Sequence, residues 1–362
     1  MRSNEGAESP PDPSSPASPL NVTMAAVATA AGVSRATASR VFYGSTPVSP
    51  RTRDAVYAAA ERLGYVPNVM ARSLAARGSD ILGLLLRDPT NPAYGLLFSE
   101  LQTHISRAGL QMVTVAPSRT EGAHFERQAL NRLLGLRVGG MFVATGVIRA
   151  EMLVPFLDRV PVVLIGRPAS HPGIYSVSYD EENNAAQLAD AVAEHGHRAV
   201  AVVTPGTDNS VAEYRRGTTM ARRLRSHGIR VHEIPAPTFG LRDEGAREII
   251  ALRRAGRITA AMFPSDMRLL AFLPHAQAAG VRVPDDLSLT GCDGIMPGND
   301  LLGFTTLRIP VERAAERAVT VMRSMLDNPG RTEITHELLP GTLVPGRTLI
   351  RPDPNETPRA GA

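Results

Sequence analysis

The sequence predicts a small all-α helix-turn-helix domain followed by an α/β core of two Rossmann-like lobes, each a parallel sheet covered by helices. Three observations predict this arrangement. Short capped helical patterns fill residues 21–66, and apolar strand patterns alternate with longer helical patterns after residue 79. Basic residues also outnumber acids in the first part. A chain of 362 residues has room for two or three domains.

The composition is that of an ordinary globular protein, with 43% hydrophobic and 20% charged residues. The apolar run Ile81–Leu86 is too short to span a membrane. A single cysteine, Cys292, excludes an internal disulfide and favours a reducing, cytoplasmic compartment. Residues 1–20 lack the apolar segment of a secretory signal and are expected to form a disordered tail, as residues 351–362 are expected to form a flexible one.

The first helix is expected at Met24–Ala31, with Thr23 as its N-cap. Gly32 follows, where a short turn needs positive φ. Ser34 then caps a second helix at Arg35–Phe42. This helix–glycine turn–helix spacing is that of a DNA-binding motif whose second helix enters the major groove.

The third helix begins where Ser49 can act as the cap and Pro50 as the first helical residue, and it ends at Gly64. Its predicted buried stripe consists of Val56, Ala59, Ala60 and Leu63. Three such helices form a small bundle, and the alternative to DNA binding is a bundle with no contact to DNA. Charge favours DNA, because residues 21–77 hold seven arginines against two acids, a local balance of +5.

A fourth, shorter helical pattern covers Val69–Ala76, after a start signal at Pro67 and Asn68. So short a helix is not stable alone. We therefore expect residues 67–78 to be a hinge helix and linker that forms only when DNA and a partner helix order it.

Strands and helices alternate in the core, which predicts parallel sheets. The expected strands are Ile81–Leu86, Gln111–Val115, Gly140–Ala144, Val162–Ile165, Ala199–Val203, Arg230–Ile234, Ala260–Phe263 and Leu287–Gly291. The expected helices include Tyr94–Ala108, Glu182–His195, Val211–His227, Met267–Ala279 and Val311–Asp327. The junction between the lobes is expected near 175–182. The first lobe would hold about 79–178 and 307–327, and the second about 179–306 and 330–350.

The sequence is similar to the lac-repressor (LacI/GalR) family of bacterial transcription regulators over residues 21–350. The motifs that carry the resemblance are VATAAGVSRATASRVFYG, VSPRTRDAVYAAAERLGYVPN, ARSL and DPTNP. The resemblance implies a core like that of periplasmic binding proteins, a homodimer, a palindromic double-stranded DNA operator and a small-molecule effector in the cleft between the lobes. The expected function is that of a repressor whose affinity for DNA depends on a small polar effector, such as a sugar.

The resemblance also implies roles for individual residues. Arg35, Ala36 and Arg40 would read bases, and Arg40 is the best candidate for a guanine contact. The residues expected to bind phosphates are Thr23, Ser34, Thr37, Ser39, Ser49 and Thr52. In the hinge, Leu74 would insert into the minor groove, with Ala71 on the same face and Asn68 at the helix start.

Effector contacts are expected from Asn91 and Tyr94, which follow the first strand, and from Asp266 and Asp293, which follow two later strands. For both aspartates the alternative is loop capping or a salt bridge. Tyr214 and Ser265 are also expected to contact the effector. Tyr214 stands where the family usually has a sugar-binding arginine, although Arg215 and Arg216 are adjacent. Other departures are Gly166 for Asp, Ser265 for Asn and Ile309 for Gln, which predict an unusual ligand or none.

An enzyme is not expected, because the nucleotide-binding glycine motifs and HExxH are absent. His195 and His197 lack a nearby carboxylate or cysteine at metal spacing, so neither a metal nor another cofactor is expected. The alternative from a different class is a cytoplasmic ligand-binding protein with a degenerate DNA module.

Overall fold

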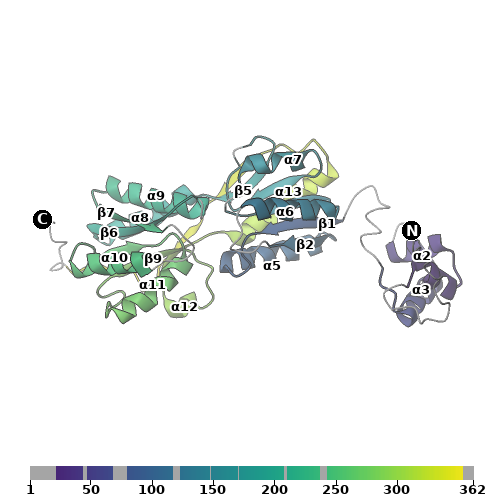
Figure 1. Cartoon of the computed structure of the whole chain (residues 1–362), viewed down its shortest axis with the longest axis horizontal. Coiled ribbons are helices and arrows are strands. Elements are labelled where there is room, and N and C mark those ends of the chain that lie inside the picture. Colours follow the sequence, from purple (N-terminus) through teal and green to yellow (C-terminus); the bar gives the residue numbers. More distant parts are fainter. Residues whose placement is uncertain are drawn as a thin grey trace, which may run out of the picture. The chain divides into compact units, whose positions relative to one another are not determined.

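The computed structural model describes residues 22–43, 47–67, 80–116, 123–146, 148–169, 171–207, 210–236 and 243–353. The chain divides into two compact units, Met1–Gly78 and Ser79–Ala362 (Figure 1). The first is a helical bundle, and the second is the two-lobed α/β core. Both parts of the predicted fold class are confirmed.

The first unit contains α1 (Met24–Ala30), α2 (Arg35–Tyr43) and α3 (Pro50–Leu63). Small and β-branched side chains form its core, because helices that cross at close range leave little room. The buried residues are Val27, Ala28, Ala38, Val41, Val56, Ala59 and Ala60. The ring of Phe42 packs 5.7 Å from that of Tyr57 and 5.5 Å from that of Tyr65, which fixes α2 against the end of α3.

The helix starts are formed as the sequence predicts. The hydroxyl oxygens of Thr23, Ser34 and Ser49 accept hydrogen bonds from the backbone N–H groups of Ala26, Thr37 and Thr52, at 3.1–3.3 Å. Gly32 in the turn has φ of 67°, a conformation that costs glycine little.

The first lobe of the core is built on a sheet whose paired strands are all parallel, in the order β11-β5-β4-β3-β1-β2. Its strands are β1 (Ile81–Leu86), β2 (Gln111–Val115), β3 (Gly140–Ala144), β4 (Val162–Ile165), β5 (Tyr175–Tyr179) and β11 (His336–Leu339). Its helices are α5 (Pro92–Arg107), α6 (Ala123–Gly135), η2 (Ala150–Met152), α7 (Val154–Leu157) and α13 (Val311–Asp327). The α5 and α13 helices pack together, as expected for a helix that returns to this lobe.

The second lobe has the order β12-β10-β9-β8-β6-β7, in which only β12 is antiparallel to its neighbour. Its strands are β6 (Ala199–Pro205), β7 (Arg230–Ala236), β8 (Ala260–Met262), β9 (Ser288–Asp293), β10 (Thr305–Arg308) and β12 (Thr342–Val344). Its helices are α8 (Glu181–Glu194), α9 (Val211–Ser226), α10 (Asp243–Arg254), α11 (Asp266–Ala278) and α12 (Asn299–Leu302). Figure 1 shows α8 and α9 on one side of this sheet and α10 and α11 on the other.

All eight predicted strands are present, but β5, β10, β11 and β12 were not predicted. All four strands are short. In β11 and β12 the side chains are exposed or only partly buried, and the sequence contains no long apolar run. The expected boundaries also place all of 330–350 in the second lobe, whereas β11 pairs with β5 in the first. Residues 336–339 add a parallel edge strand to the first sheet before the chain crosses back to β12.

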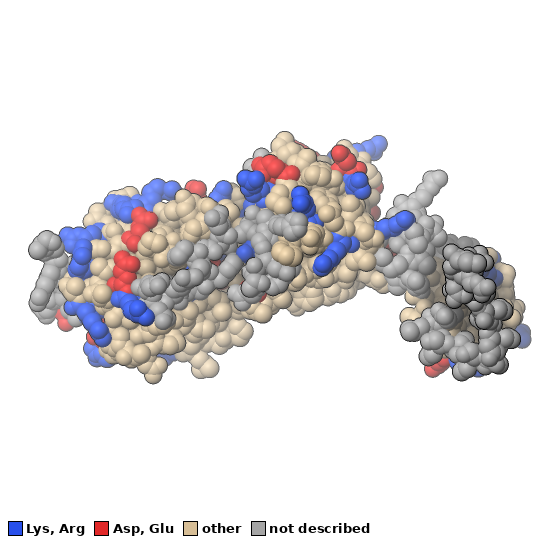
Figure 2. Space-filling model, viewed as in Figure 1, with Lys and Arg blue, Asp and Glu red and all other residues tan. Residues whose placement is uncertain are grey.

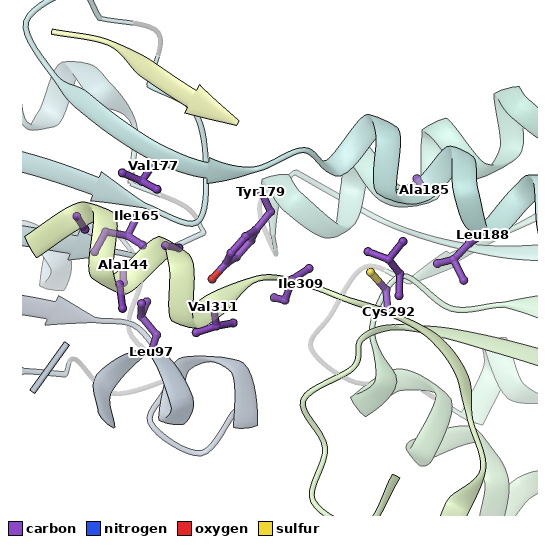
Figure 3. Close-up of a cluster of buried hydrophobic side chains, with 14 of the residues drawn as sticks. Leu97, Ala144, Ile165, Val177, Tyr179, Ala185, Leu188, Cys292, Ile309 and Val311 are labelled. Carbon is purple, nitrogen blue, oxygen red and sulfur yellow. The ribbon is translucent and has the colours of Figure 1, made fainter. Parts of the chain in front are cut away.

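The chain therefore passes between the lobes three times, at Tyr179–Glu181, Arg308–Val311 and Leu339–Thr342. One hydrophobic core runs through these crossings. Figure 3 shows the side chains of Tyr179, Ile309 and Val311 between those of the first lobe and those of the second, including Cys292. Because the core is continuous, the lobes share one packed joint at the base of the cleft.

Gly217 in α9 tests how closely this helix packs on its sheet. A Cβ atom there would lie 2.8 Å from the carbonyl oxygen of Val203. We expect Gly217→Ala to lower the free energy of unfolding by about 1–3 kcal/mol, because overpacking outweighs the gain in helix propensity of roughly 0.5–1 kcal/mol. Urea unfolding followed by circular dichroism measures the change.

The matched control is Gly95→Ala in α5, where the nearest atom, the carbonyl oxygen of Pro89, would be 3.8 Å from the new Cβ. This variant should be as stable as the parent or slightly more stable. Equal stability of both variants would show that α9 can move away from β6 without cost.

Candidate DNA-binding and ligand-binding sites

The residues that α2 buries in the bundle determine which of its residues face the solvent. Ala38 and Val41 are buried in the bundle, which leaves Arg35, Ala36 and Arg40 exposed to solvent. These are the three residues predicted to read bases. A helix that presents its first residues on a rigid, capped bundle has the geometry of a recognition helix.

The side chain of Arg40 lies along its own helix. Its Nε donates to the carbonyl oxygen of Ala36 at 3.3 Å, and its Nη2 donates to Oγ1 of Thr37 at 3.4 Å. Both contacts are long and exposed, so they contribute little stability. A guanine edge, which accepts two hydrogen bonds from a guanidinium, is a stronger partner than either.

The predicted phosphate-binding hydroxyls cluster at helix starts. The Oγ of Ser34 lies 2.9 Å from Oγ1 of Thr37, and the Oγ of Ser49 lies 2.9 Å from Oγ1 of Thr52. A hydroxyl can accept from a backbone N–H and still donate its proton. Capping is therefore compatible with donation to a phosphate. Thr23 and Ser39 lie at the start of α1 and on α2, whereas Asn68, Ala71 and Leu74 lie outside the described residues.

A cavity of about 250 Å³ lies between the two lobes of the core. Its walls come mainly from the carboxyl ends of the strands, the usual ligand position in open parallel sheets. Arg87 follows β1, Thr145 follows β3, Arg167 follows β4, and Ser265 follows β8. At the rim, the backbone N–H of Val211 in the second lobe donates to the carbonyl oxygen of Gly146 in the first, at 3.3 Å.

The floor of the cavity is organised by Arg216, which is only 4% exposed. Its guanidinium donates to both carboxylate oxygens of Glu181, with Nη2 to Oε1 at 2.9 Å. Its Nη1 donates to Asp293 at 2.7 Å and to the carbonyl oxygen of Pro264 at 3.0 Å. A buried arginine needs such complete pairing, because an unpaired charge would be strongly destabilising.

A second buried ion pair lies beside the first. Arg268 is 2% exposed, and its Nε donates to Oε2 of Glu213 at 2.7 Å. Across the cavity, burial raises the pKa of Tyr94 to about 12, so its hydroxyl is a proton donor at neutral pH. The cavity thus presents both donors and acceptors, which suits a polar ligand.

The predicted effector residues divide into two groups. Asn91, Tyr94, Ser265 and Asp293 line the cavity. Asn91 also caps α5, because its Oδ1 accepts from the N–H of Ala93 at 2.9 Å.

Two predicted effector residues do not line the cavity. Asp266 accepts from the Gly294 N–H and the Thr306 hydroxyl, both at 2.7 Å, so its carboxylate caps a loop. Tyr214 is 40% exposed on α9 and lies outside the lining.

Sequence reasoning missed the charged residues at the centre of the site. The lining residues not predicted include Arg87, Arg167, Glu181, Glu213, Arg216 and Arg268. Helical spacing could have predicted that Arg216 is buried, because it lies on the same face of α9 as Gly217, Met220 and Leu224, which are all buried. Tyr214 lies on a different face of the helix.

Other titratable groups have structural partners. Burial lowers the pKa of His197 to about 4, and its ring lies 2.8 Å from Oγ1 of Thr259. Cys292 is buried. Within the described ranges, no cluster of three or more His, Cys, Asp or Glu side chains could hold a metal ion. No described helix is long and apolar enough to cross a membrane.

The surface of the core carries both signs of charge. On the face in Figure 2, arginines and acidic side chains are interspersed over the core. Exposed ion pairs of the core include Arg223 with Asp190 and Arg225 with Glu233. This face therefore does not present a field of one sign.

Two family profiles match the chain. The profile described as "Bacterial regulatory proteins, lacI family" matches residues 23–68, and "Periplasmic binding protein-like domain" matches residues 189–349. The transcriptional regulator AscG of Escherichia coli is 29% identical over 91% of this chain and 99% of its own length. The regulator CelR of Thermobifida fusca is 30% identical over 84% of this chain and 95% of its own.

Solved structures share the fold of most of the chain. The lac repressor dimer bound to operator and the anti-inducer ONPF superimposes with a TM-score of 0.76 at 22% identity. The match covers 91% of this chain and 99% of the repressor chain. At this identity the likeness concerns the fold, which spans both the helical unit and the core.

The buried carboxyl group of Asp293 should make the stability of the protein depend on pH. Burial raises the pKa of Asp293 to about 7, although Arg216 opposes the shift. A carboxyl whose pKa is raised on folding stabilises the protein fully below its unfolded pKa of about 4, and this contribution is lost as pH rises through about 7. The unfolding free energy of the parent, relative to Asp293→Asn, should therefore fall as the pH rises between these values.

Urea unfolding of both proteins at a series of pH values measures this difference. Asn resembles Asp in shape and also tolerates the positive φ of 112° at this position. A difference that stays constant with pH would show that Arg216 keeps Asp293 ionised throughout.

Proposed function

The chain belongs to the LacI family of bacterial regulatory proteins, and we propose on that premise that it represses transcription by binding a palindromic DNA operator as a homodimer. It is a helix-turn-helix transcriptional regulator, as its relatives are. The proposal adds that a small polar molecule in the cleft sets its affinity for the operator.

One observation carries the DNA-binding part of the proposal. The capped bundle holds Arg35, Ala36 and Arg40 on the exposed side of α2. In the proposed complex these residues contact base edges. The hydroxyls of Thr23, Ser34, Thr37, Ser39, Ser49 and Thr52 contact phosphates and set the register.

The proposed dimer gives the operator its symmetry. A two-fold dimer places two recognition helices on two half-sites, so the preferred DNA is a palindrome. The structure of the lac repressor dimer on its operator supports this by analogy. The hinge residues Asn68, Ala71 and Leu74 are proposed to contact the minor groove between the half-sites, with Leu74 as the apolar wedge.

The cavity between the lobes is the proposed effector site. It combines buried ion pairs with the hydroxyl of Tyr94 and is closed at one edge by the contact of Gly146 with Val211. The lac repressor structure likewise contains a small molecule, the anti-inducer ONPF. A ligand that binds one arrangement of the lobes better than another shifts their equilibrium, and that shift is the proposed control of DNA binding.

We further propose that the protein acts in the cytoplasm, where the chromosome lies, and that it is not an enzyme. The relatives are regulators. Arg216 and Arg268 hold Glu181, Asp293 and Glu213 in ion pairs, whereas nucleophilic catalysis needs a nucleophile beside a free base.

Arg40→Ala tests base reading directly. We expect the variant to lose about 1–3 kcal/mol of binding to the selected operator but little binding to random DNA, because a base contact carries sequence information. Fluorescence anisotropy with both DNAs at several salt concentrations measures the two affinities.

Arg62→Ala is the matched control, because it also removes an exposed arginine, at the far end of α3. It should leave the ratio of specific to random binding unchanged. An equal loss on both DNAs in Arg40→Ala would instead place this arginine on a phosphate. If the parent protein did not distinguish any sequence from random DNA, it would be a ligand-binding protein with a degenerate DNA module.

A further inference from the structure

Arg167 differs from the other arginines of the cavity. It follows β4 at the first-lobe wall, and burial lowers its pKa. Its Nε and Nη2 atoms are buried and have no hydrogen-bond partner among the residues that the structure describes. Leaving buried donors of a charged group unpaired is unfavourable, so a site of this kind favours an acceptor from outside the chain.

The remaining cavity arginines have carboxylate partners. Arg216 pairs with Glu181 and Asp293, Arg268 pairs with Glu213, and Arg87 pairs with Glu126 at 3.2 Å. Within the described part of the chain, the ion pairs of the cavity therefore involve each of its arginines except Arg167. Glu126, Glu181, Glu213 and Asp293 are thus already engaged with other arginines.

Glu126 supplies a second unpaired atom. Its Oε1 accepts from Arg87 and from the hydroxyl of Thr145 at 2.5 Å, whereas its Oε2 is buried and has no partner in the described structure. The negative charge of Glu126 acts on Arg167 without a direct hydrogen bond. Glu126 is not among the residues that line the cavity, so the contact with a ligand is assigned to Arg167 alone.

We propose that the effector is an anion whose carboxylate or phosphate binds Nε and Nη2 of Arg167. This inference rests on the cavity being the effector site. The Nε and Nη2 edge of a guanidinium offers two parallel N–H bonds that match two oxygens of a carboxylate or phosphate. A cavity of about 250 Å³ is at the small end of ligand sites, which suits an anion of monosaccharide size.

The test compares acids with neutral molecules of the same skeleton. The full chain is mixed with glucuronate, glucose, galacturonate, galactose or glucose 6-phosphate, and thermal stability and calorimetric binding are measured without DNA. We expect a sugar acid or the sugar phosphate to bind and raise the unfolding temperature, and its neutral counterpart to bind at least about tenfold more weakly. The member that binds distinguishes a carboxylate from a phosphate.

Variants assign the effect to Arg167. Arg167→Gln should weaken binding of the anion about 10- to 100-fold, and Arg167→Lys should recover only part of it, because lysine keeps the charge and loses the two-pronged geometry. Arg149→Gln is the matched control, since Arg149 is an exposed arginine of the same lobe. It should bind the anion as the parent does.

Three results would overturn the inference. They are binding of neutral sugars as tightly as acids, undiminished anion binding in Arg167→Gln, and failure of every anion in the set to bind. An anion that binds through Arg167 but leaves operator affinity unchanged would support an anion site at Arg167 and contradict the proposed control of DNA binding by the cleft. The two proposals therefore fail separately.

Discussion

The ion pairs of Arg216 are the constraint on which the core depends. A guanidinium at 4% exposure must find acceptors for nearly all its N–H groups. Glu181, Asp293 and the carbonyl of Pro264 provide them. They fix the start of α8, the end of β9 and the loop after β8 relative to α9, and Gly217 lets α9 lie close enough to β6 for the pairing. The ligand cavity is thus assembled around one buried charge.

The three chain crossings connect the two lobes at the base of the cavity. The hydrophobic core continues through Tyr179, Ile309 and Val311 (Figure 3), so the lobes can rotate about the crossings but cannot separate there. Away from the joint, the contact of Val211 with Gly146 is a single long hydrogen bond. A ligand that spans the cavity can therefore change the angle between the lobes at low cost, whereas the base of the cleft stays packed.

The helices and strands that depend on a local sequence pattern could be predicted from the sequence. Caps at Thr23, Ser34 and Ser49 and continuous apolar runs such as Ile81–Leu86 place helices and strands to within a few residues. It was insufficient for β11, whose partner β5 lies about 160 residues away, because its half-exposed side chains carry no local signal. The charged residues of the cavity could not be predicted for the same reason. Tertiary contacts decide which acids pair with Arg216, and they leave Arg167 without an acidic partner among the described residues.

In the proposed switch, closure of the cleft controls the affinity for operator DNA. A Cβ at Gly146 would lie 3.8 Å from the Cβ of Ser210, a spacing that suits a disulfide. Gly146→Cys with Ser210→Cys would thus hold the lobes closed when oxidised and release them when reduced, while Cys292 stays buried. The decisive measurement is the operator dissociation constant of this variant in both states. Control by the cleft predicts a change of about 5- to 150-fold on reduction, and equal constants would contradict it.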